Sequence, residues 1–278
     1  MDLKALIKRS PKLLVGLCIF TFFVLFAILG PFLYPVDPKK PQFESLAPPS
    51  IKHPLGTDIL GRDLLAQLIW GTGYSLKIGI MAALISLAIG IMVGGIGGYF
   101  GGMIDEILNL TSNVVLTIPT IAFLIVVAAY FRTRSEWTVI LLISSTAWAG
   151  MARSIRSQVL SLKTREFIDL AKLSNLSRVR ILFFEVLPNM LSYIVMYLAL
   201  SVAGAIGSEA GLSAIGLGPT EIVSLGILLR WAIVWEAVRY GAWWWFLPVG
   251  LTITLITLSL LLINDGLDQI YNPRARRS

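Results

Sequence analysis

The sequence predicts an all-α integral membrane protein that crosses the bilayer six times. The 278-residue chain is 56% hydrophobic and only 14% charged, and its mean hydropathy is +0.80. Soluble domains carry roughly 25% charged residues, so a chain this apolar would expose much of its hydrophobic surface to water. This composition excludes a soluble globular enzyme and a disordered chain. One cysteine, Cys18, and one histidine, His53, exclude an internal disulfide, a cysteine metal cluster and a polyhistidine metal site.

Six apolar runs are candidates for the spans, because about 20 residues of helix cross a ~30 Å hydrocarbon core. They cover residues 13–34, 75–98, 107–130, 137–151, 190–208 and 243–264. The first has a basic start like that of a signal peptide, but it is too long and lacks a small-residue cleavage site. It is therefore interpreted as an uncleaved anchor. The fourth is the shortest and contains Ser144, Ser145 and Thr146.

The distribution of basic residues predicts that both termini are cytoplasmic. With six spans, the inner segments hold 14 of the 23 lysines and arginines, as the positive-inside rule expects. Residues 1–12 and 266–278 are then cytoplasmic tails, 35–74 is an extracytoplasmic loop, and 75–265 form the transmembrane core. The net charge of +7 is explained by this topology rather than by nucleic-acid binding.

Small residues and one acid stand out within the apolar segments. Gly90, Gly94, Gly98 and Gly102 recur every four residues, a spacing that lets membrane helices pack closely. The Gly-Gly pairs there also permit a sharp turn at the inner surface. Glu209 lies at the edge of the fifth span. Because neighbouring spans offer it no Asp, Lys or His partner, a hydrogen-bonded structural or gating role near the outer mouth is favoured over a proton relay.

No catalytic motif is present in the sequence. A phosphate-binding Gly-x-x-x-x-Gly-Lys-Ser/Thr loop, a His-Glu-x-x-His pair and a Gly-x-Ser-x-Gly elbow are all absent. The chain is therefore predicted not to be an enzyme.

The segment between the fourth and fifth spans, residues 153–188, is basic but patterned as helix. Thr164 is a candidate cap for a short helix whose predicted apolar face is Phe167, Leu170, Ala171 and Ser174. Ser177 is a candidate cap for a second helix, whose apolar positions are Val179, Leu182, Phe183 and Val186. The helix pattern by itself leaves two interpretations open: docking into a groove of a partner protein, or lying on the lipid surface.

Residues 166–177 and 181–189 of this segment resemble the EAA loop of bacterial and archaeal ABC importer permeases. Asp169, Leu170 and Ala171 occupy the positions of the Glu-Ala-Ala triplet, and Leu187-Pro188-Asn189 matches the downstream motif. Asn175 replaces the usual glycine. Asparagine tolerates left-handed backbone better than most residues, so the turn is expected to survive.

Three further stretches resemble the C-type subunit of dipeptide/oligopeptide/nickel permeases: residues 53–63, 212–218 and 264–274. The resemblance covers nearly the whole chain in order. It implies a type I ABC importer permease fold in the cytoplasmic (inner) cell membrane. It also implies that this chain forms half of the solute pathway.

The resemblance also implies partners and a coupling site. The expected partners are a second, B-type permease subunit, one or two ABC ATPases, an extracytoplasmic solute-binding protein and membrane lipid. ATP and magnesium would bind the ATPases, and no cofactor is expected on this chain. The residues assigned to ATPase coupling are Glu166, Phe167, Asp169, Leu170, Ala171, Lys172, Asn175 and Pro188. Glu166 and Lys172 would be rim charges, and Pro188 would set the angle into the fifth span.

The sequence leaves more than one class of solute open. The family resemblance favours dipeptides or oligopeptides, and leaves oligosaccharides or nickel as alternatives. Trp231, Trp235, Tyr240 and residues 243–245 could stack on sugar rings, but such residues also form interfacial belts. An alternative class is a self-sufficient ion-coupled carrier or channel, which would require repeats and a mid-span ionisable site that the sequence lacks.

Overall fold

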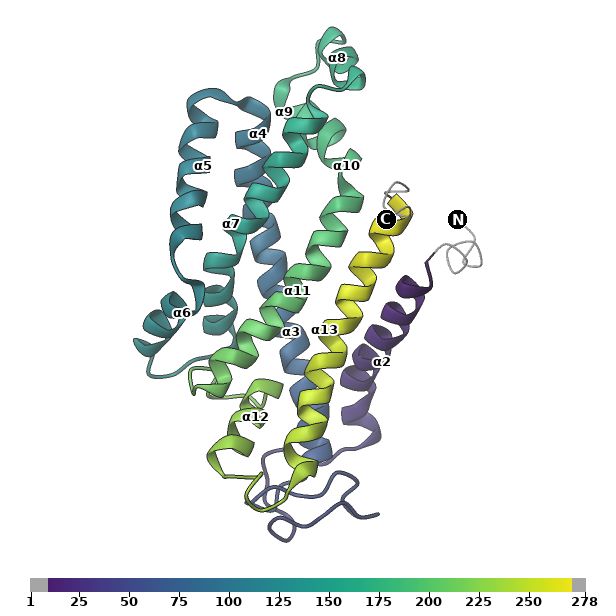
Figure 1. The fold of residues 1–278 in the computed structure, drawn as a ribbon, viewed down its shortest axis with the longest axis vertical. Coiled ribbons are helices and arrows are strands. Elements are labelled where there is room, and N and C mark those ends of the chain that lie inside the picture. Colours follow the sequence, from purple (N-terminus) through teal and green to yellow (C-terminus); the bar gives the residue numbers. More distant parts are fainter. Residues whose placement is uncertain (1–9, 272–278) are drawn as a thin grey trace.

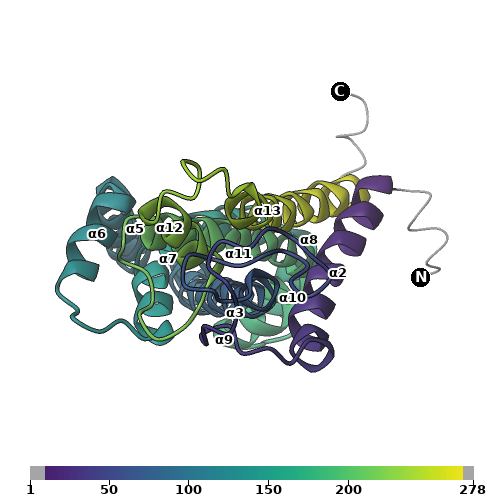
Figure 2. The same ribbon diagram turned by 90° about the horizontal axis from the view of Figure 1, so that it is seen from below.

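A computed structural model describes residues 10–271, a bundle of long helices aligned along one axis (Figure 1). Its five long apolar helices are α2 (Pro11–Leu33), α3 (Leu64–Gly90), α7 (Glu136–Leu162), α11 (Leu191–Ala214) and α13 (Trp243–Tyr271). A bent pair, α5 (Gly102–Thr117) and α6 (Thr120–Ala129), completes six spans when counted as one. The described residues contain no strand. Figure 2 places α2 and α5–α6 at opposite edges of the bundle.

Several helices extend past the predicted spans, and α3 and α7 do so by the most residues. α3 begins at Leu64 rather than at residue 75, so the outer loop ends at Asp63, whose side chain accepts a hydrogen bond from the Ala66 amide. α3 continues through a π-helical segment, η1 (Ile91–Gly95), into α4 (Ile96–Phe100). α7 likewise runs past the predicted end at residue 151 to Leu162. Hydropathy detects the most apolar stretch of a helix. α7 continues beyond that stretch with polar residues such as Arg153 and Arg156, and the added first turns of α3 interrupt their apolar residues with Gln67, Thr72 and glycines.

The predicted third span, 107–130, is not one straight helix, because α5 and α6 meet at 80°. Proline restricts the residue before it to extended backbone, and Ile118 before Pro119 has φ −77° and ψ 125°. A bidentate ion pair between Arg156 of α7 and Asp105 of α5 joins these two helices. The Arg156 Nε and Nη2 atoms lie 2.5 and 2.6 Å from the two carboxylate oxygens of Asp105.

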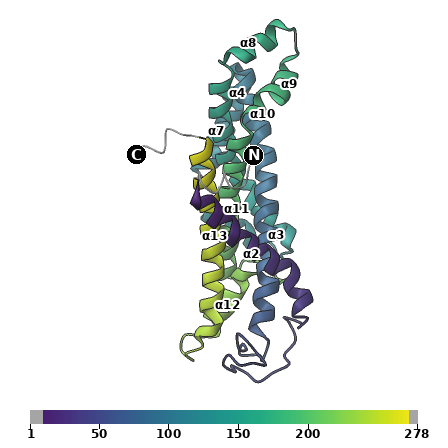
Figure 3. The same cartoon turned by 90° about the vertical axis from the view of Figure 1, so that its right-hand side faces the viewer.

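The start of α2 and the end of α13 lie at the same end of the bundle, which also carries α8 and α9 (Figures 1 and 3). The Ser10 hydroxyl donates to Gln269 Oε1 at 3.0 Å, and Lys12 Nζ lies 3.2 Å from Asp265 Oδ2. An even number of spans brings both ends of a chain to the same side of the membrane, so the position of these two helix ends agrees with the six predicted spans. The predicted tails extend into residues 1–9 and 272–278, which lie outside the described residues.

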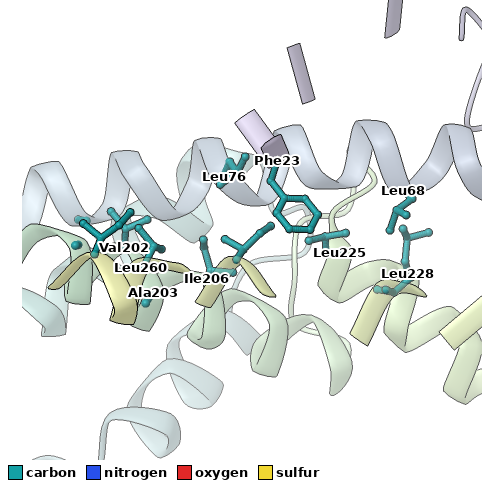
Figure 4. Packing of buried hydrophobic residues seen from close by; sticks show 14 of the residues in the cluster. Phe23, Leu68, Leu76, Val202, Ala203, Ile206, Leu225, Leu228 and Leu260 are labelled. Carbon is teal, nitrogen blue, oxygen red and sulfur yellow. The ribbon is translucent and has the colours of Figure 1, made fainter. Parts of the chain in front are cut away.

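The main apolar core is formed where α2, α3, α11, α13 and α12 (Leu225–Val234) meet. Figure 4 shows Phe23 of α2 directed between Leu76 of α3 and Leu225 of α12, with Ile206 of α11 beside them. The helices that carry this cluster are far apart in sequence. Together they form one packed body that positions the outer segments.

The glycine ladder packs α3 and its continuation against α7, as its spacing predicts. A Cβ atom on Gly90 would meet the Met151 side chain, and one on Gly94 would meet the backbone oxygen of Ala152. At the end of α4, Gly101 and Gly102 have φ of 69° and 59°. These left-handed conformations make the sharp turn into α5.

Replacing Gly94 by alanine should destabilise the protein by about 1–3 kcal/mol, because the new Cβ has only backbone to displace. The measurement is the thermal unfolding midpoint of the detergent-purified chain. Gly250→Ala is the matched control, since a Cβ there meets nothing within 4 Å. Equal midpoints for the two variants would show that α3 and α7 do not pack this closely.

The outer loop, residues 34–63, is ordered around a buried carboxylate. Asp58 is fully buried and accepts hydrogen bonds from Arg62 Nε at 2.6 Å and from Gln67 Nε2 at 2.9 Å. The Arg62 guanidinium carbon lies 4.0 Å from the centre of the Trp231 ring, a cation–π contact. This contact joins the outer loop to α12.

Replacing Asp58 by alanine should cost roughly 3–5 kcal/mol, because it leaves the Arg62 guanidinium buried without its anion. The expected results are a lower unfolding midpoint and faster cleavage of residues 34–63 by protease added to the outer side. Asp37→Ala, at a partly exposed carboxylate of the same loop, should change neither. Unchanged protease resistance of the Asp58 variant would contradict this account of the loop.

Candidate functional site

The predicted cytoplasmic segment forms a short helix, α8 (Glu166–Leu173), that stands away from the bundle at one end (Figure 1). It is followed by α9 (Arg178–Ile181), a π-helical segment η2 (Leu182–Val186) and α10 (Leu187–Asn189). Ser177 caps α9 as predicted, accepting the Arg180 amide. Thr164 does not cap α8, because that helix begins after Arg165 and the Thr164 hydroxyl donates instead to the Ser161 carbonyl.

The turn that ends α8 has the left-handed residue that the sequence predicts. Asn175 has φ 57°, the region that asparagine tolerates better than most residues. The amides of Ser174, Asn175 and Leu176 donate to carbonyls in the last turns of α8. These bonds satisfy helix-end carbonyls that would otherwise lack partners. Asn175 can therefore replace a glycine here.

The inner face of α8 packs against the rest of this chain. Ile168 is 0% exposed and Ala171 8% exposed, and both belong to an apolar cluster with Ile181, Leu182 and residues of α7. The predicted single face of Phe167, Leu170, Ala171 and Ser174 is therefore wrong. Ala171 points inward with Ile168, three residues before it, because residues three apart share a helix face.

The opposite face of α8 is apolar and uncovered. Leu170 is 64% exposed and Leu173 82% exposed; these two residues are called the α8 ridge below. Phe184 on the neighbouring η2 is also exposed. The prediction omitted Leu173 and Phe184, although the three-residue spacing from Leu170 to Leu173 could have identified the first. Phe167 is half-buried at the edge of the inner cluster.

Charged residues surround the α8 ridge. Lys172 Nζ lies 2.8 Å from Asp169 Oδ1, and both side chains are more than half exposed. Such a pair contributes little to stability in water. Glu166 is exposed in the first turn of α8, where the positive end of the helix dipole favours an acid. The ridge thus has the apolar centre and charged rim typical of a protein contact.

Pro188 lies in α10, just before α11. The helical path breaks at Met190, whose φ is −108° and ψ 12°, and resumes at Leu191. The Asn189 side-chain amide donates to the Glu185 carbonyl at 2.7 Å. The proline therefore lies beside the bend that leads from the α8–α10 segment into α11, where the sequence predicted a change of angle.

Glu209 is fully buried inside α11, not at its end as predicted, because α11 continues to Ala214. Its carboxylate accepts three hydroxyl bonds, from Ser75 of α3 at 3.1 Å and from Ser213 and Ser224 at 2.6 Å each. Ser224 also caps α12, and the Ser75 hydroxyl accepts the Leu225 amide at 3.0 Å. One carboxylate thus joins α3, α11 and α12.

Comparison with protein families identifies the chain. Residues 86–277 match the family described as binding-protein-dependent transport system inner membrane component. Residues 7–49 match the N-terminal transmembrane domain of oligopeptide transport permease C. The chain belongs to this permease family. It is a multi-pass membrane protein and a permease subunit of an ABC importer.

Relatives of this permease match it over almost its full length. The dipeptide transport system permease protein DppC of Bacillus subtilis is 33% identical over 98% of this chain and 84% of its own. The oligopeptide transport system permease protein OppC of the same organism is 33% identical, covering 97% and 88%. OppC of Mycobacterium bovis is 37% identical, covering 83% and 79%.

The fold of this permease is found in a solved ABC transporter. A chain of the MetNI methionine transporter, in an inward-facing conformation, superposes with a TM-score of 0.60 and 18% identity. The match covers 76% of this permease and 97% of that chain. The similarity confirms the predicted ABC importer permease fold.

Proposed function

We propose that this permease imports dipeptides or oligopeptides and is driven by separate ABC ATPases that bind the α8 ridge. The observation that supports this is the uncovered apolar pair Leu170 and Leu173 on a helix whose other face is already packed. This chain has no phosphate-binding loop in its sequence, so ATP-driven import by it requires ATPases on other chains. A groove on a partner would bury the ridge, as amphipathic helices do.

The other partners follow from the same proposal. A second, B-type permease subunit would complete the solute pathway, and an extracytoplasmic binding protein would deliver the peptide to the ordered outer end. ATP and magnesium would bind the one or two ATPase subunits and not this chain. The ends of α2 and α13 and the α8 segment would then lie in the cytoplasm.

Peptides are preferred because the relatives are dipeptide and oligopeptide permeases by name. The outer tryptophans give oligosaccharides little support, since several are used in packing. Trp245 is fully buried, Trp244 Nε1 donates to the Thr57 carbonyl at 3.4 Å, and Trp231 lies against Arg62.

Purification from native membranes in mild detergent tests the assembly. Mass spectrometry should find a second permease subunit and one or two ATPases in stoichiometric amounts with this chain. Recovery of the chain alone would contradict the proposal and favour a self-sufficient carrier or channel. Ligand released from the co-encoded binding protein should be peptide, whereas a sugar or nickel would correct the solute.

A further inference from the structure

A hollow of about 450 Å³ lies where α2 ends and α3 begins, at the end of the bundle opposite α8 (Figure 1). It is called the outer pocket below. Trp70 and Tyr74, on consecutive turns of α3, form one wall. The other wall is the segment that ends α2 and begins the outer loop, and it contains Pro31, Pro35 and Pro38. Because proline fixes its own φ, this second wall is held in shape without a ligand.

The wall on α3, called the aromatic wall below, offers ring surface to the pocket. The centres of the Trp70 and Tyr74 rings lie 6.3 Å apart, and the ring planes are inclined by only 27°. Trp70 is 37% exposed although it belongs to a helix that is packed on its other sides. The faces of indole and phenol rings carry partial negative charge and attract cations. The aromatic wall is therefore suited to an ammonium group.

A carboxylate lies on the opposite wall. Asp37 lines the outer pocket, and its side chain is 39% exposed. The Lys39 amide donates to Asp37 Oδ1 at 2.9 Å and lowers the pKa of this carboxyl from its ordinary value, so the group is ionised at neutral pH. Its Oδ2 atom faces Lys40 Nζ at 3.5 Å, and the lysine is 71% exposed. Such a pair is weak in water, so the carboxylate can accept a second cation.

The outer pocket lies at the level expected for lipid headgroups. The apolar helix α2 ends at Leu33, and the predicted span within α3 begins at residue 75, directly after Tyr74. Tryptophan and tyrosine are enriched at this boundary. Phe32 and Leu33 directly follow Pro31 of the pocket wall and are each 81% exposed. A free solute ammonium would leave these two side chains uncovered, whereas the acyl chain of a lipid would bury them.

We infer that the outer pocket binds the headgroup of a zwitterionic membrane phospholipid, in which an ammonium is joined to a phosphate. The ammonium lies between Asp37 and the aromatic wall. The phosphate pairs with the exposed Lys40, which is released from its weak contact with Asp37, and an acyl chain covers Phe32 and Leu33. A lipid bound in this way joins the end of α2, the outer loop and the start of α3. Its binding is independent of which solute is imported.

The chain itself, purified in detergent and freed of lipid, is titrated with phosphatidylethanolamine or with phosphatidylglycerol of the same acyl chains. Both lipids carry a phosphate, but only the first carries an ammonium. Saturating phosphatidylethanolamine should raise the thermal unfolding midpoint by roughly 5 °C, because a ligand that binds only the folded chain stabilises it. Phosphatidylglycerol should raise it much less. Native mass spectrometry should find one retained phosphatidylethanolamine for each chain.

Variants locate the site. Asp37→Asn and Trp70→Leu should each weaken phosphatidylethanolamine binding roughly tenfold, since each removes one of the two groups that face the ammonium. Trp70→Phe keeps a ring and should retain most of the affinity. The matched control is Trp235→Leu, at a 42% exposed tryptophan that follows α12 outside the pocket. Its affinity should be unchanged. Midpoints measured without lipid separate any effect of these substitutions on folding from their effect on binding.

Four outcomes would overturn the inference. Equal shifts with the two lipids would show that only acyl chains bind. Unchanged phosphatidylethanolamine affinity in both Asp37→Asn and Trp70→Leu would place the lipid elsewhere. Displacement of the lipid by a free dipeptide would show that the pocket takes the ammonium of a solute. Retention of the lipid by the isolated chain but not by the assembled transporter would show that a partner subunit covers the pocket.

Discussion

Replacing Leu170 by aspartate should abolish ATP-driven uptake while leaving the helical bundle folded. The side chain is 64% exposed on the α8 ridge, so a polar replacement there costs the isolated chain little. In the proposed complex the same position is buried in an ATPase groove, where an unpaired carboxylate is strongly unfavourable. The affinity for the ATPase should fall roughly 30-fold to 1,000-fold, since a central apolar contact is worth roughly 2–4 kcal/mol.

The measurement is co-purification of the ATPase together with peptide uptake in proteoliposomes. Leu173→Asp should behave in the same way, because it changes the other half of the ridge. Ile51→Asp changes a fully exposed residue of the outer loop and should affect neither readout. Normal ATPase binding and uptake by both ridge variants would exclude this surface as the docking site.

A substitution at Ala171 separates the packing of α8 on its own chain from the docking of α8 on an ATPase. It lies on the inner face of α8, so a bulky charged residue there should displace α8 from its own chain. The ridge variants should instead leave that packing intact. Protease sensitivity of residues 163–190 in the isolated chain should therefore rise for Ala171→Glu and remain unchanged for Leu170→Asp.

Replacing Glu209 by alanine should destabilise the protein by roughly 2–5 kcal/mol, because it leaves buried hydroxyls without their acceptor. Ser75, Ser213 and Ser224 all donate to this carboxylate. Its loss should also loosen α12, which Ser224 caps. A lower unfolding midpoint and reduced uptake are expected together.

Glu209→Gln is the matched variant. The glutamine carbonyl oxygen can still accept the bonds from Ser213 and Ser224, so the variant should transport nearly as well as the natural chain at every pH. Uptake that falls in the glutamine variant in a pH-dependent way would contradict a structural role. It would then favour a proton-coupled carrier.

Much of this fold can be predicted from local pattern. The spans follow from apolar length, because a bare backbone cannot remain in hydrocarbon. The cap at Ser177 and the left-handed Asn175 follow from side-chain chemistry within a few residues. The glycine spacing of residues 90–102 correctly indicates both close packing and a turn.

The errors have a common cause. The straight third span, the start of α3 and the single apolar face of α8 were inferred from hydropathy and spacing alone. Hydropathy cannot separate a bent pair from one helix, and it is insensitive to a helix that continues outside lipid. Spacing identifies an apolar face but not whether the same chain or a partner covers it.

The sequence by itself determined the membrane setting, the apolar spans, the permease family and the location of the helical segment between the fourth and fifth spans, because each depends on composition or on residues close together in the chain. Only the tertiary structure decided that Ala171 is packed inside while Leu170 and Leu173 are free. It likewise brought Ser75 and Ser224 to Glu209. Those arrangements depend on which distant segments meet in space, and packing rather than local pattern sets that.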